Sequence, residues 1–299
     1  MAEVGRDRAQ QRARERIGFI GVGTMGSPVV GHLLDKGYPV TVFARRAEAA
    51  APLVARGALA AASPRAVAEA SDVVFTMVTA TSDVEQVVFG PDGVAAGFNP
   101  GALLIDMSTI APEATRGFAT RLADQGVDLL DAPVSGGPEG ASKGTLSIMV
   151  GGAEQALERA RPILAAFSTS VFHMGPSGAG QVTKACHQLL LLITAEGVAE
   201  SLSLAAKAGV DPGKVREVML TAMASSRVLD RFGALMAART FAPGIPARIY
   251  KKDLQIVRDL ADAVGAALPA GDVVRANVGK VLDAGRGDED LSVLITTLD

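Results

Sequence analysis

The feature that most constrains the fold is a glycine-rich turn directly after a short apolar run near the start of the chain. The run Ile17–Ile20 leads into Gly21, Gly23 and Gly26, spaced Gly-x-Gly-x-x-Gly, and a helical stretch continues to about Asp35. In such a turn the first glycine permits the bend, the second lets a pyrophosphate approach the backbone, and the third lets the helix pack on the strand. The free N–H groups at the helix N-terminus favour negative charge. This context predicts a dinucleotide-binding unit.

The end of the second predicted strand indicates which dinucleotide is preferred. An NAD site usually offers Asp or Glu to the ribose 2′-hydroxyl about 20 residues past the glycines. This chain instead carries Arg45 and Arg46 after the apolar residues 39–43. Two guanidinium groups can hold a 2′-phosphate by charge-assisted bidentate hydrogen bonds, so we expect NADP to be favoured, with NAD as the alternative. The residues expected to contact the cofactor here are Gly21, Val22, Gly23, Thr24, Met25, Gly26, Arg45 and Arg46.

Short β-branched runs alternate with helix-length stretches rich in Ala and Leu up to about residue 178. This alternation is typical of right-handed βαβ units and of a parallel sheet that is buried on both faces. We therefore expect a Rossmann-type α/β dinucleotide-binding domain over residues 17–177, preceded by a solvated extension of residues 1–16. The runs lie at residues 17–20, 39–43, 72–78, 102–107, 127–131 and 147–150.

The second part of the chain has helical patterns only. Residues 179–208 contain no proline, place apolar residues near helical spacing and are followed by Gly209, a suitable C′ residue. At about 1.5 Å per residue this helix would span roughly 45 Å, more than a small domain needs. We expect it to join the first domain to an all-helical substrate and oligomerisation domain over residues 178–299. Further helices are predicted from Asp211-Pro212 and over residues 225–238, 252–264 and 272–284.

Several further motifs occur in a fixed order along the chain. Residues 131–137 read Asp-Ala-Pro-Val-Ser-Gly-Gly, residues 175–184 read Gly-x-x-Gly-x-Gly-x-x-x-Lys, and residues 251–254 read Lys-Lys-Asp-Leu. With the glycine turn and Asp-Met-Ser-Thr at 106–109, these motifs resemble the β-hydroxyacid dehydrogenases. That family contains 3-hydroxyisobutyrate dehydrogenase and tartronate semialdehyde reductase (2-hydroxy-3-oxopropionate reductase), and it belongs to the 6-phosphogluconate dehydrogenase superfamily. The resemblance covers residues 17–298.

The resemblance implies a role for each motif. Lys184 would be the general acid/base, protonating the nascent alkoxide as NADPH delivers hydride to an aldehyde and removing the hydroxyl proton in reverse. The turn of Ser135, Gly136 and Gly137 would bind the substrate carboxylate through backbone N–H groups and the serine hydroxyl. Lys252 would reach toward substrate and cofactor. The residues expected on the nicotinamide side are Val78, Thr79 and Thr109.

The helix that carries Lys184 departs from the family pattern. Residues three and four positions further along lie on the same helix face as the lysine. Many relatives carry an asparagine there that bonds the substrate, whereas this chain carries His187 and Gln188. The resemblance implies that both bond substrate oxygens; the alternative for His187 is an ordinary core histidine. This difference leaves the identity of the substrate undetermined more than the type of reaction.

Composition excludes several other classes of protein. The 299 residues carry 29 Lys+Arg against 32 Asp+Glu, which gives no basic field for nucleic acid. One cysteine, Cys186, excludes an internal disulfide, and three histidines give no zinc spacing, so we expect no metal. The leucine run at 189–193 is shorter than the roughly 18 apolar residues of a membrane span, so we expect no membrane partner. It suits instead the interface of a homodimer or homotetramer. Residues 1–16 lack a secretory pattern, so we expect a cytoplasmic protein.

The sequence therefore predicts an NADP-preferring oxidoreductase of the β-hydroxyacid dehydrogenase type. Its substrate would be a small carboxylated aldehyde or hydroxy acid, with tartronate semialdehyde and methylmalonate semialdehyde as candidates. Two alternatives stay open. Imine reductases share the architecture but usually replace the lysine by Asp or Tyr, and some relatives that have lost the lysine are non-catalytic dinucleotide-binding scaffolds. The presence of Lys184 disfavours both.

Overall fold

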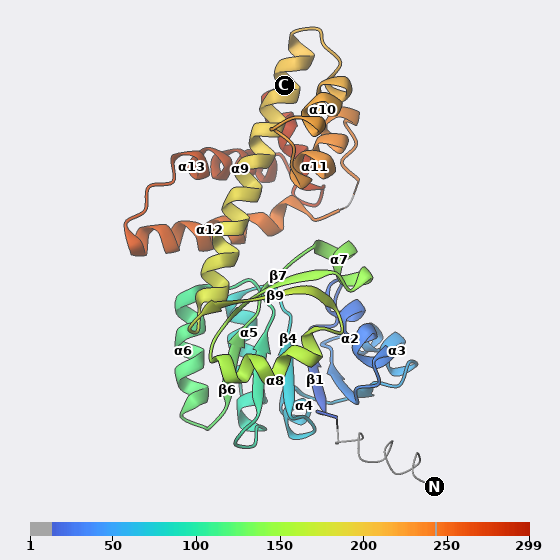
Figure 1. Ribbon diagram of the computed structural model, residues 1–299, viewed down its shortest axis with the longest axis vertical. Coiled ribbons are helices and arrows are strands. Elements are labelled where there is room, and N and C mark those ends of the chain that lie inside the picture. The colour runs from blue at the N-terminus through green and yellow to red at the C-terminus, as the bar shows by residue number, and fades with distance from the viewer. Residues whose placement is uncertain (1–13, 243) are drawn as a thin grey trace. The chain divides into compact units, whose positions relative to one another are not determined.

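The computed structural model describes residues 14–242 and 244–299 of the chain (Figure 1). These residues form two compact units, one ending at Lys184 and the other covering Ala185–Asp299. The division falls inside the long helix α9 (Ala179–Lys207). The first unit is an α/β structure and the second is helical, which confirms the predicted fold class.

The sheet of the first unit is built around six parallel strands in the order β3-β2-β1-β4-β5-β6. Each of the predicted runs up to residue 131 forms one of these strands, because β-branched residues suit strands that are buried on both faces. The two-residue strand β3 was not predicted. The six strands are β1 (Ile17–Ile20), β2 (Val40–Phe43), β3 (Leu59–Ala60), β4 (Val73–Thr76), β5 (Leu103–Asp106) and β6 (Asp128–Asp131).

Three more strands extend the sheet beyond β6. Strand β8 (Leu146–Gly151) lies antiparallel to β6 through the pair Asp131 and Gly151. Strand β7 (Val134–Ser135) is antiparallel to β8, and β9 (Ser168–Gly175) is parallel to it. The sequence pattern predicts β8 but neither β7 nor β9. Strand β8 thus lies between the segment that follows β6 and the segment that leads into helix α9.

Helices cover both faces of this sheet (Figure 1). Helix α4 has a side-chain N-cap, since Ser63 accepts the N–H of Ala66 at 3.1 Å. The helices of the first unit are α2 (Gly26–Asp35), α3 (Ala47–Val54), α4 (Pro64–Glu69), α5 (Thr81–Phe89), α6 (Pro112–Ala123), α7 (Gly137–Lys143) and α8 (Glu154–Leu164), with a 3-10 turn at Val94–Ala96.

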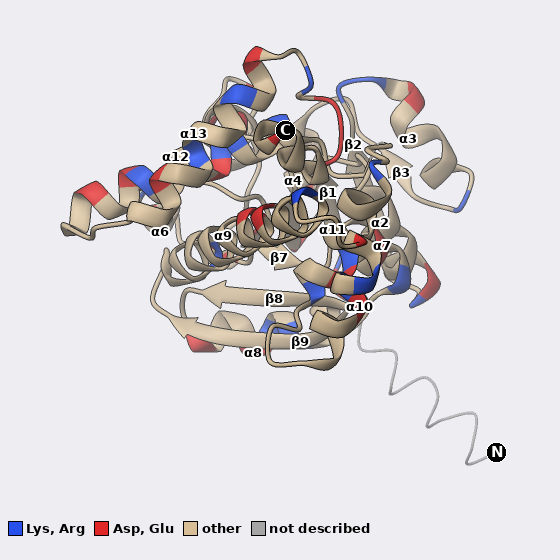
Figure 2. Ribbon diagram, turned by 90° about the horizontal axis from the view of Figure 1, so that it is seen from above, with Lys and Arg blue, Asp and Glu red and all other residues tan. Residues whose placement is uncertain are grey.

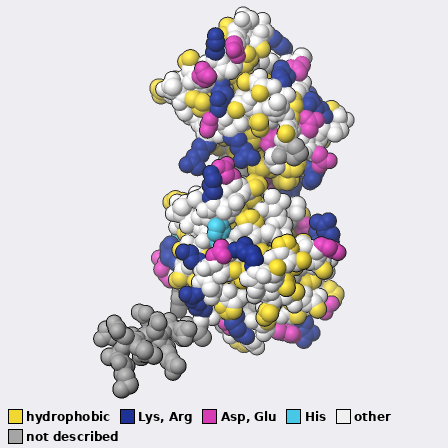
Figure 3. Space-filling model, turned by 90° about the vertical axis from the view of Figure 1, so that its right-hand side faces the viewer, with side chains coloured by type: hydrophobic (Ala, Val, Ile, Leu, Met, Phe, Trp, Pro, Cys, Tyr) yellow, Lys and Arg dark blue, Asp and Glu magenta, His cyan; other side chains and the backbone are white. Residues whose placement is uncertain are grey.

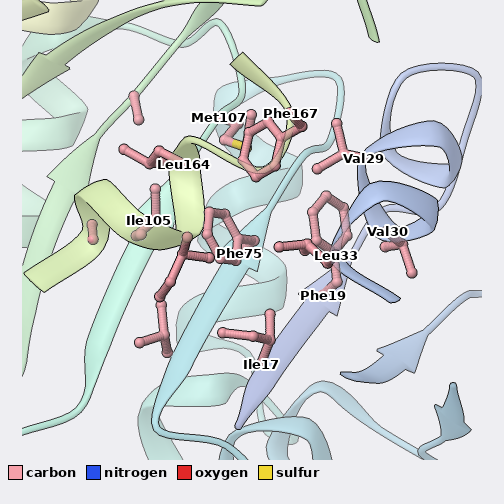
Figure 4. Close-up of a cluster of buried hydrophobic side chains, with 14 of the residues drawn as sticks. Ile17, Phe19, Val29, Val30, Leu33, Phe75, Ile105, Met107, Leu164 and Phe167 are labelled. Atoms are coloured by element: carbon pink, nitrogen blue, oxygen red, sulfur yellow. The ribbon is translucent and has the colours of Figure 1, made fainter. Parts of the chain in front are cut away.

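The hydrophobic core of the first unit has two layers, because alternate residues of a strand point to opposite faces of a sheet. On one face Phe19, Phe75 and Ile105 pack with helices α2 and α8, and the rings of Phe19 and Phe75 stack with centroids 5.8 Å apart (Figure 4). On the other face Val74 and Leu104 pack against α4, α5 and α6. The carboxyl ends of the parallel strands are thus held at one edge, where ligands of such sheets bind.

The start of the described chain is attached to the first unit. Arg16 pairs with Asp72 at 2.7 Å, and Glu15 pairs with Arg159 at 2.8 Å. The extension expected over residues 1–16 therefore does not include these two residues, which ion pairs hold to β4 and α8. Residues 1–13 lie outside the described part of the chain.

The second unit consists of helices around a core of its own. Asp211 caps α10 by accepting the N–H of Gly213, as its Asp-Pro start predicts. Helix α12 begins at Ala247, five residues before its predicted start at 252. The helices after α9 are α10 (Pro212–Thr221), α11 (Arg227–Ala238), α12 (Ala247–Val264) and α13 (Pro269–Asp283), followed by a 3-10 segment at Leu291–Leu298.

Helix α9 is the one helix in the described ranges whose length and hydropathy would allow it to cross a membrane. Of its most apolar window, 44% is buried, and Leu192, Val198 and Leu202 belong to the core of the second unit. The core helix of a globular protein has the same length and composition, so the expected absence of a membrane partner stays a prediction.

Charges of both signs are mixed over the surface. Helix α12 carries both basic and acidic residues (Figure 2), and its Arg258 pairs with Asp262. On the face drawn in Figure 3, basic and acidic side chains are likewise interspersed. This mixture agrees with a net charge of −3.

Candidate functional site

A pocket of about 260 Å³ opens at the carboxyl ends of β1, β2 and β4. It brings together seven residues that the sequence analysis assigned to the cofactor: Gly21, Val22, Gly23, Arg45, Arg46, Val78 and Thr79. Other lining residues were not predicted, among them Asp83 and Gln86 on helix α5. Asp83 and Gln86 lie three residues apart and therefore on one face of α5, a signal that could have revealed them.

The glycines of the turn have separate structural reasons. Gly21 has a φ of 103°, and a Cβ there would lie 2.1 Å from the carbonyl oxygen of Met77. A Cβ on Gly26 would lie 2.1 Å from the carbonyl oxygen of Gly21, so this glycine lets α2 pack against the turn. A Cβ on Gly23 would meet no atom within 4 Å. Open space above this exposed backbone fits a pyrophosphate, whereas the other two glycines are required by the protein itself.

The basic residues of the pocket lie at its β2 end. Arg45 and Arg46 follow β2, are exposed, and line the pocket with Gly21 and Gly23. The carboxylate of Asp83 also lines it, and its Oδ2 accepts the N–H of Ala80 at 3.0 Å, which caps α5. The residues present therefore fit a dinucleotide.

Five predicted cofactor residues are not among those that line this pocket, and one of them, Lys252, belongs to the second unit. Thr24 is exposed in the turn, Met25 packs partly against the core, and Gly26 is buried at the start of α2. Met25, the N-cap residue of α2, makes no side-chain hydrogen bond to the first turn. Thr109 is half-buried between β5 and α6.

The loop expected to bind the substrate carboxylate leads from β7 into α7. Ser135 pairs with Ser147 of β8, and Gly136 and Gly137 have φ values of 131° and 60°. These positive φ values are readily adopted only by glycine and explain the Gly-Gly pair. At the other end of α7, the Nε2 of His32 lies 3.1 Å from the carbonyl oxygen of Ala141.

Helix α9 is anchored to the sheet by a buried carboxylate. Asp131, the last residue of β6, is fully buried; its Oδ1 accepts the N–H of Gly178 at 2.7 Å and its Oδ2 that of Gln181 at 2.9 Å. Burial raises the pKa of Asp131 to about 6, although these backbone hydrogen bonds act in the opposite direction. Lys184, 7% exposed, follows Gln181 by three residues. The sequence alone predicts no role for Asp131 or Gln181.

A second set of hydrogen bonds joins β4, β5 and the same turn of α9. The hydroxyl of Thr76 donates to Asp106 at 2.8 Å, and the N–H of Val78 donates to the hydroxyl of Ser108 at 3.0 Å. The amide of Gln181 donates to the carbonyl of Ser108 at 2.8 Å and accepts the N–H of Ile110 at 3.1 Å. The strand end expected at the nicotinamide is thus fixed to the helix that carries Lys184.

The predicted substrate residues of the second unit lie in one polar cluster. The amide of Gln188 donates to Oδ2 of Asp253 at 2.5 Å, and the Nδ1 of His187 lies 3.1 Å from Oε1 of Gln188. The Nζ of Lys252 lies 2.9 Å from Oδ1 of Asp253. Asp253 is buried and joins helices α9 and α12, a role that the sequence analysis did not assign. Within the described ranges, no group of three or more His, Cys, Asp or Glu could hold a metal ion.

Two family models together match almost the whole chain. The NAD binding domain of 6-phosphogluconate dehydrogenase matches residues 16–175, and the NAD-binding model of NADP-dependent 3-hydroxyisobutyrate dehydrogenase matches residues 178–298. The chain is 40% identical over 254 residues to 2-hydroxy-3-oxopropionate reductase of Escherichia coli (strain K12), covering 85% of this chain and 87% of that protein. The chain belongs to the β-hydroxyacid dehydrogenase family. The resemblance drawn from the motifs is thereby confirmed.

Two further comparisons describe this β-hydroxyacid dehydrogenase. It is 41% identical over 266 residues to 3-hydroxyisobutyrate dehydrogenase of Pseudomonas aeruginosa, covering 87% of this chain and 89% of that protein. Its fold matches the solved 3-hydroxyisobutyrate dehydrogenase of Mycobacterium tuberculosis with L-serine, with a TM-score of 0.88, 32% identity, and coverage of 95% and 99% of the two chains. The protein is an NAD(P)-dependent hydroxyacid dehydrogenase, and its cofactor is a nicotinamide dinucleotide.

Proposed function

We propose that this enzyme uses NADPH to reduce the semialdehyde of a small 3-hydroxy acid, and NADP to catalyse the reverse oxidation, with Lys184 as general acid/base. The names of the similar enzymes from Escherichia coli and Pseudomonas aeruginosa support tartronate semialdehyde and methylmalonate semialdehyde as candidate substrates. L-Serine is a third candidate, because the similar Mycobacterium tuberculosis structure contains it. A carboxylate is common to all three.

The observation that carries this proposal is the place of Lys184 within the first unit. The glycine turn follows β1, Val78 follows β4, and Ser108 follows β5, all at the carboxyl edge of the parallel strands. Asp131 and Gln181 attach the first turn of α9 to this same edge. The amino group of Lys184, which can give or take a proton, therefore follows directly after a turn fixed to the dinucleotide-binding edge of the sheet.

Each group of the chain has one task in the proposed reaction. When bound, the nicotinamide supplies the hydride that forms the new C–H bond, or accepts it in oxidation. The electron pair of the carbonyl bond passes to the substrate oxygen, and the Nζ of Lys184 gives that oxygen its proton. The Ser135, Gly136 and Gly137 turn holds the carboxylate through N–H groups and a hydroxyl. His187, Gln188 and Lys252 supply hydrogen bonds to the other substrate oxygens.

The proposed preference for NADPH is supported by the two arginines of the pocket. Arg45 and Arg46 stand where NAD sites usually carry an acidic residue. Guanidinium groups form charge-assisted hydrogen bonds to a 2′-phosphate. These are stronger than the hydrogen bonds that the same groups form to a neutral ribose hydroxyl. Thr24, Met25, Gly26, Thr79 and Thr109 complete the proposed cofactor contacts.

We also propose a cytoplasmic homodimer or homotetramer. Two large apolar residues of helix α9 support self-association, since Leu190 is 67% and Leu204 71% exposed in the single chain. Light scattering on the purified protein tests the oligomer, and a monomer at micromolar concentration would contradict it.

The decisive experiment follows the absorbance of NADPH or NADH with a panel of small carboxylated aldehydes, and NADP reduction with hydroxy acids and L-serine. Lys184→Ala is measured beside the wild type, with Lys251→Ala, a change at an exposed lysine, as the control. One substrate should be turned over, and Lys184→Ala should lose about a hundredfold or more, the usual contribution of a general acid. Full activity of Lys184→Ala would contradict the proposal.

A failure of the whole panel has its own meaning. If NADPH binds with micromolar affinity but no carboxylated substrate reacts, the imine reductase and scaffold alternatives gain support. A panel of cyclic imines then separates these two. Reaction with the expected substrates but with NADH preferred would leave the chemistry intact and contradict the role of Arg45 and Arg46.

A further inference from the structure

We infer that Asp131 and Gln181 are positioning residues for Lys184, which fix the lysine relative to the turn that holds the substrate carboxylate. The inference rests on the proposed function, in which Lys184 moves the proton. Neither residue touches the reacting atoms in this proposal; both act through the first turn of α9.

Asp131 joins the two segments at their shared end. It is the last residue of β6, and the chain reaches Ser135 only four residues later. Its two carboxylate oxygens accept the N–H groups of Gly178 and Gln181, which have no carbonyl partner within the helix at that end. One side chain therefore fixes where α9 starts and lies at the start of the substrate loop.

The packing around this carboxylate leaves little room for another arrangement. A Cβ on Gly180 would lie 2.4 Å from the carbonyl oxygen of Met149 and 2.6 Å from that of Asp131. A Cβ on Gly151 would lie 2.5 Å from Oδ1 of Asp131. Glycine at 151 and 180 thus lets the backbones of β6, β8 and α9 meet at contact distance. The helix end can shift only if this packing is broken.

Gln181 holds the same turn from a second strand. The residue is 1% exposed, and its side-chain amide donates to the carbonyl of Ser108 and accepts the N–H of Ile110, both after β5. Lys184 follows Gln181 by three residues, which is nearly one turn and about 4.5 Å along the helix axis. Two strands thus set the height and rotation of the turn that precedes the lysine.

A misplacement of this turn is expected to slow the chemical step. Displacements of about 1 Å in a reacting group can cost on the order of a hundredfold in rate. The competing explanation is that Asp131 is an ordinary helix cap that contributes stability alone, typically about 1 kcal/mol. The two explanations differ in whether the effect of Asp131 depends on Lys184.

A double-mutant cycle separates the two explanations. The rate of hydride transfer is measured in a single turnover, with saturating NADPH and substrate, for wild type, Asp131→Asn, Lys184→Ala and the double variant. Asp131→Asn keeps the size of the side chain and one acceptor oxygen. We expect it to slow hydride transfer by about tenfold or more when Lys184 is present, and by less than about twofold when Lys184 is replaced.

The matched control is Asp128→Asn, a change of the same type at the exposed start of β6. It should leave the rate unchanged in both backgrounds. NADPH binding and the melting temperature are recorded for every variant, so that the rates refer to folded, cofactor-loaded protein. If Asp131→Asn does not fold, Gln181→Met replaces it in the cycle, with the same dependence on Lys184 expected.

Two results would overturn the inference, and they can be told apart. Equal losses in both backgrounds would mean that Asp131 and Gln181 act independently of the lysine, while the proposed function stands. A Lys184→Ala variant with the wild-type rate of hydride transfer would contradict the proposed function itself.

Discussion

The Nε2 atom of His32, on helix α2, lies 3.1 Å from the carbonyl oxygen of Ala141, near the end of helix α7. The same nitrogen lies 3.0 Å from the carbonyl oxygen of Ser142. Helix α2 starts at the glycine turn of the dinucleotide pocket, and α7 starts at the turn proposed to hold the substrate carboxylate. One imidazole thus joins the far ends of the two helices.

Replacing His32 should affect substrate more than cofactor. In His32→Ala the carbonyl groups at the end of α7 lose their donor, a loss of about 0.5–1.5 kcal/mol per hydrogen bond. We expect the KM for the carboxylated substrate to rise about two- to tenfold, with the Kd for NADPH unchanged in a fluorescence titration. His32→Gln, which keeps an N–H donor, should restore part of the loss. Equal rises in both constants would show that the imidazole only supports the fold.

The glycines of the turn should separate cofactor binding from stability. Gly23→Ala places its methyl group in open space, so the thermal stability of the cofactor-free protein should stay near that of the wild type while NADPH binding weakens at least tenfold. Gly26→Ala forces a contact with the carbonyl of Gly21 and should lower the unfolding free energy by about 1–3 kcal/mol. Calorimetry without cofactor and fluorescence with NADPH measure the two effects. Normal NADPH affinity in Gly23→Ala would place the pyrophosphate elsewhere.

The arginines of the pocket should decide the cofactor preference. A hydrogen bond to a charged group contributes about 1.5–3 kcal/mol, so we expect Arg45→Ala to raise the KM for NADPH by about 10- to 100-fold. The KM for NADH should change little, because that cofactor lacks the 2′-phosphate. Arg46→Ala measured in parallel shows which guanidinium carries the larger share. A parallel loss with both cofactors would point to a general contribution to pocket structure.

Asp131 should make stability depend on pH in an unusual direction. Its pKa is about 6 in the folded chain, above the ordinary 3.8, so the folded chain binds this proton more tightly than the unfolded chain. Its contribution to stability is therefore full below about pH 4 and is lost as the pH rises through 6. A shift of about two pKa units corresponds to about 3 kcal/mol.

Urea unfolding of wild type and Asp131→Asn between pH 4 and 7 tests this. The other carboxyl groups are common to both proteins, so their contributions cancel in the difference. The unfolding free energy of the wild type should fall relative to the variant by about 2.5 kcal/mol across that range. A constant difference would mean that Asp131 titrates normally.

Strands with a clear hydrophobic pattern could be predicted from the sequence. Strands that are defined only by pairing with a neighbouring strand could not. The segments that form β1, β4 and β5 are buried on both faces, and their β-branched residues identify them as strands directly from the sequence. Strands β3 and β7 have two residues each, too few for a periodic pattern. Strand β9 opens with Ser168-Thr169-Ser170 and is largely exposed, so only its partner β8 defines it as a strand.

The candidate site could be predicted where glycine spacing and lysine motifs mark it. The pocket residues that were missed, such as Asp83 and Gln86, come from a helix that follows another strand and bear no motif of their own. Asp131 was visible within a motif, but its role depends on a contact with Gly178 and Gln181, about 50 residues further along the chain. Such long-range backbone contacts leave no local signal in the sequence.

The division between the two units falls between Lys184 and Ala185, within a continuous helix. No flexible linker is available there for a protease to cut. A chimaera made with a relative must be joined in helical register, and the position of the junction decides which parent provides each function. The lysine proposed for proton transfer would come with the dinucleotide-binding unit, whereas His187 and Gln188, proposed for substrate recognition, would come with the helical unit. Moving the junction by less than one helical turn would therefore change which parent provides the residue for proton transfer and which provides the residues for substrate recognition.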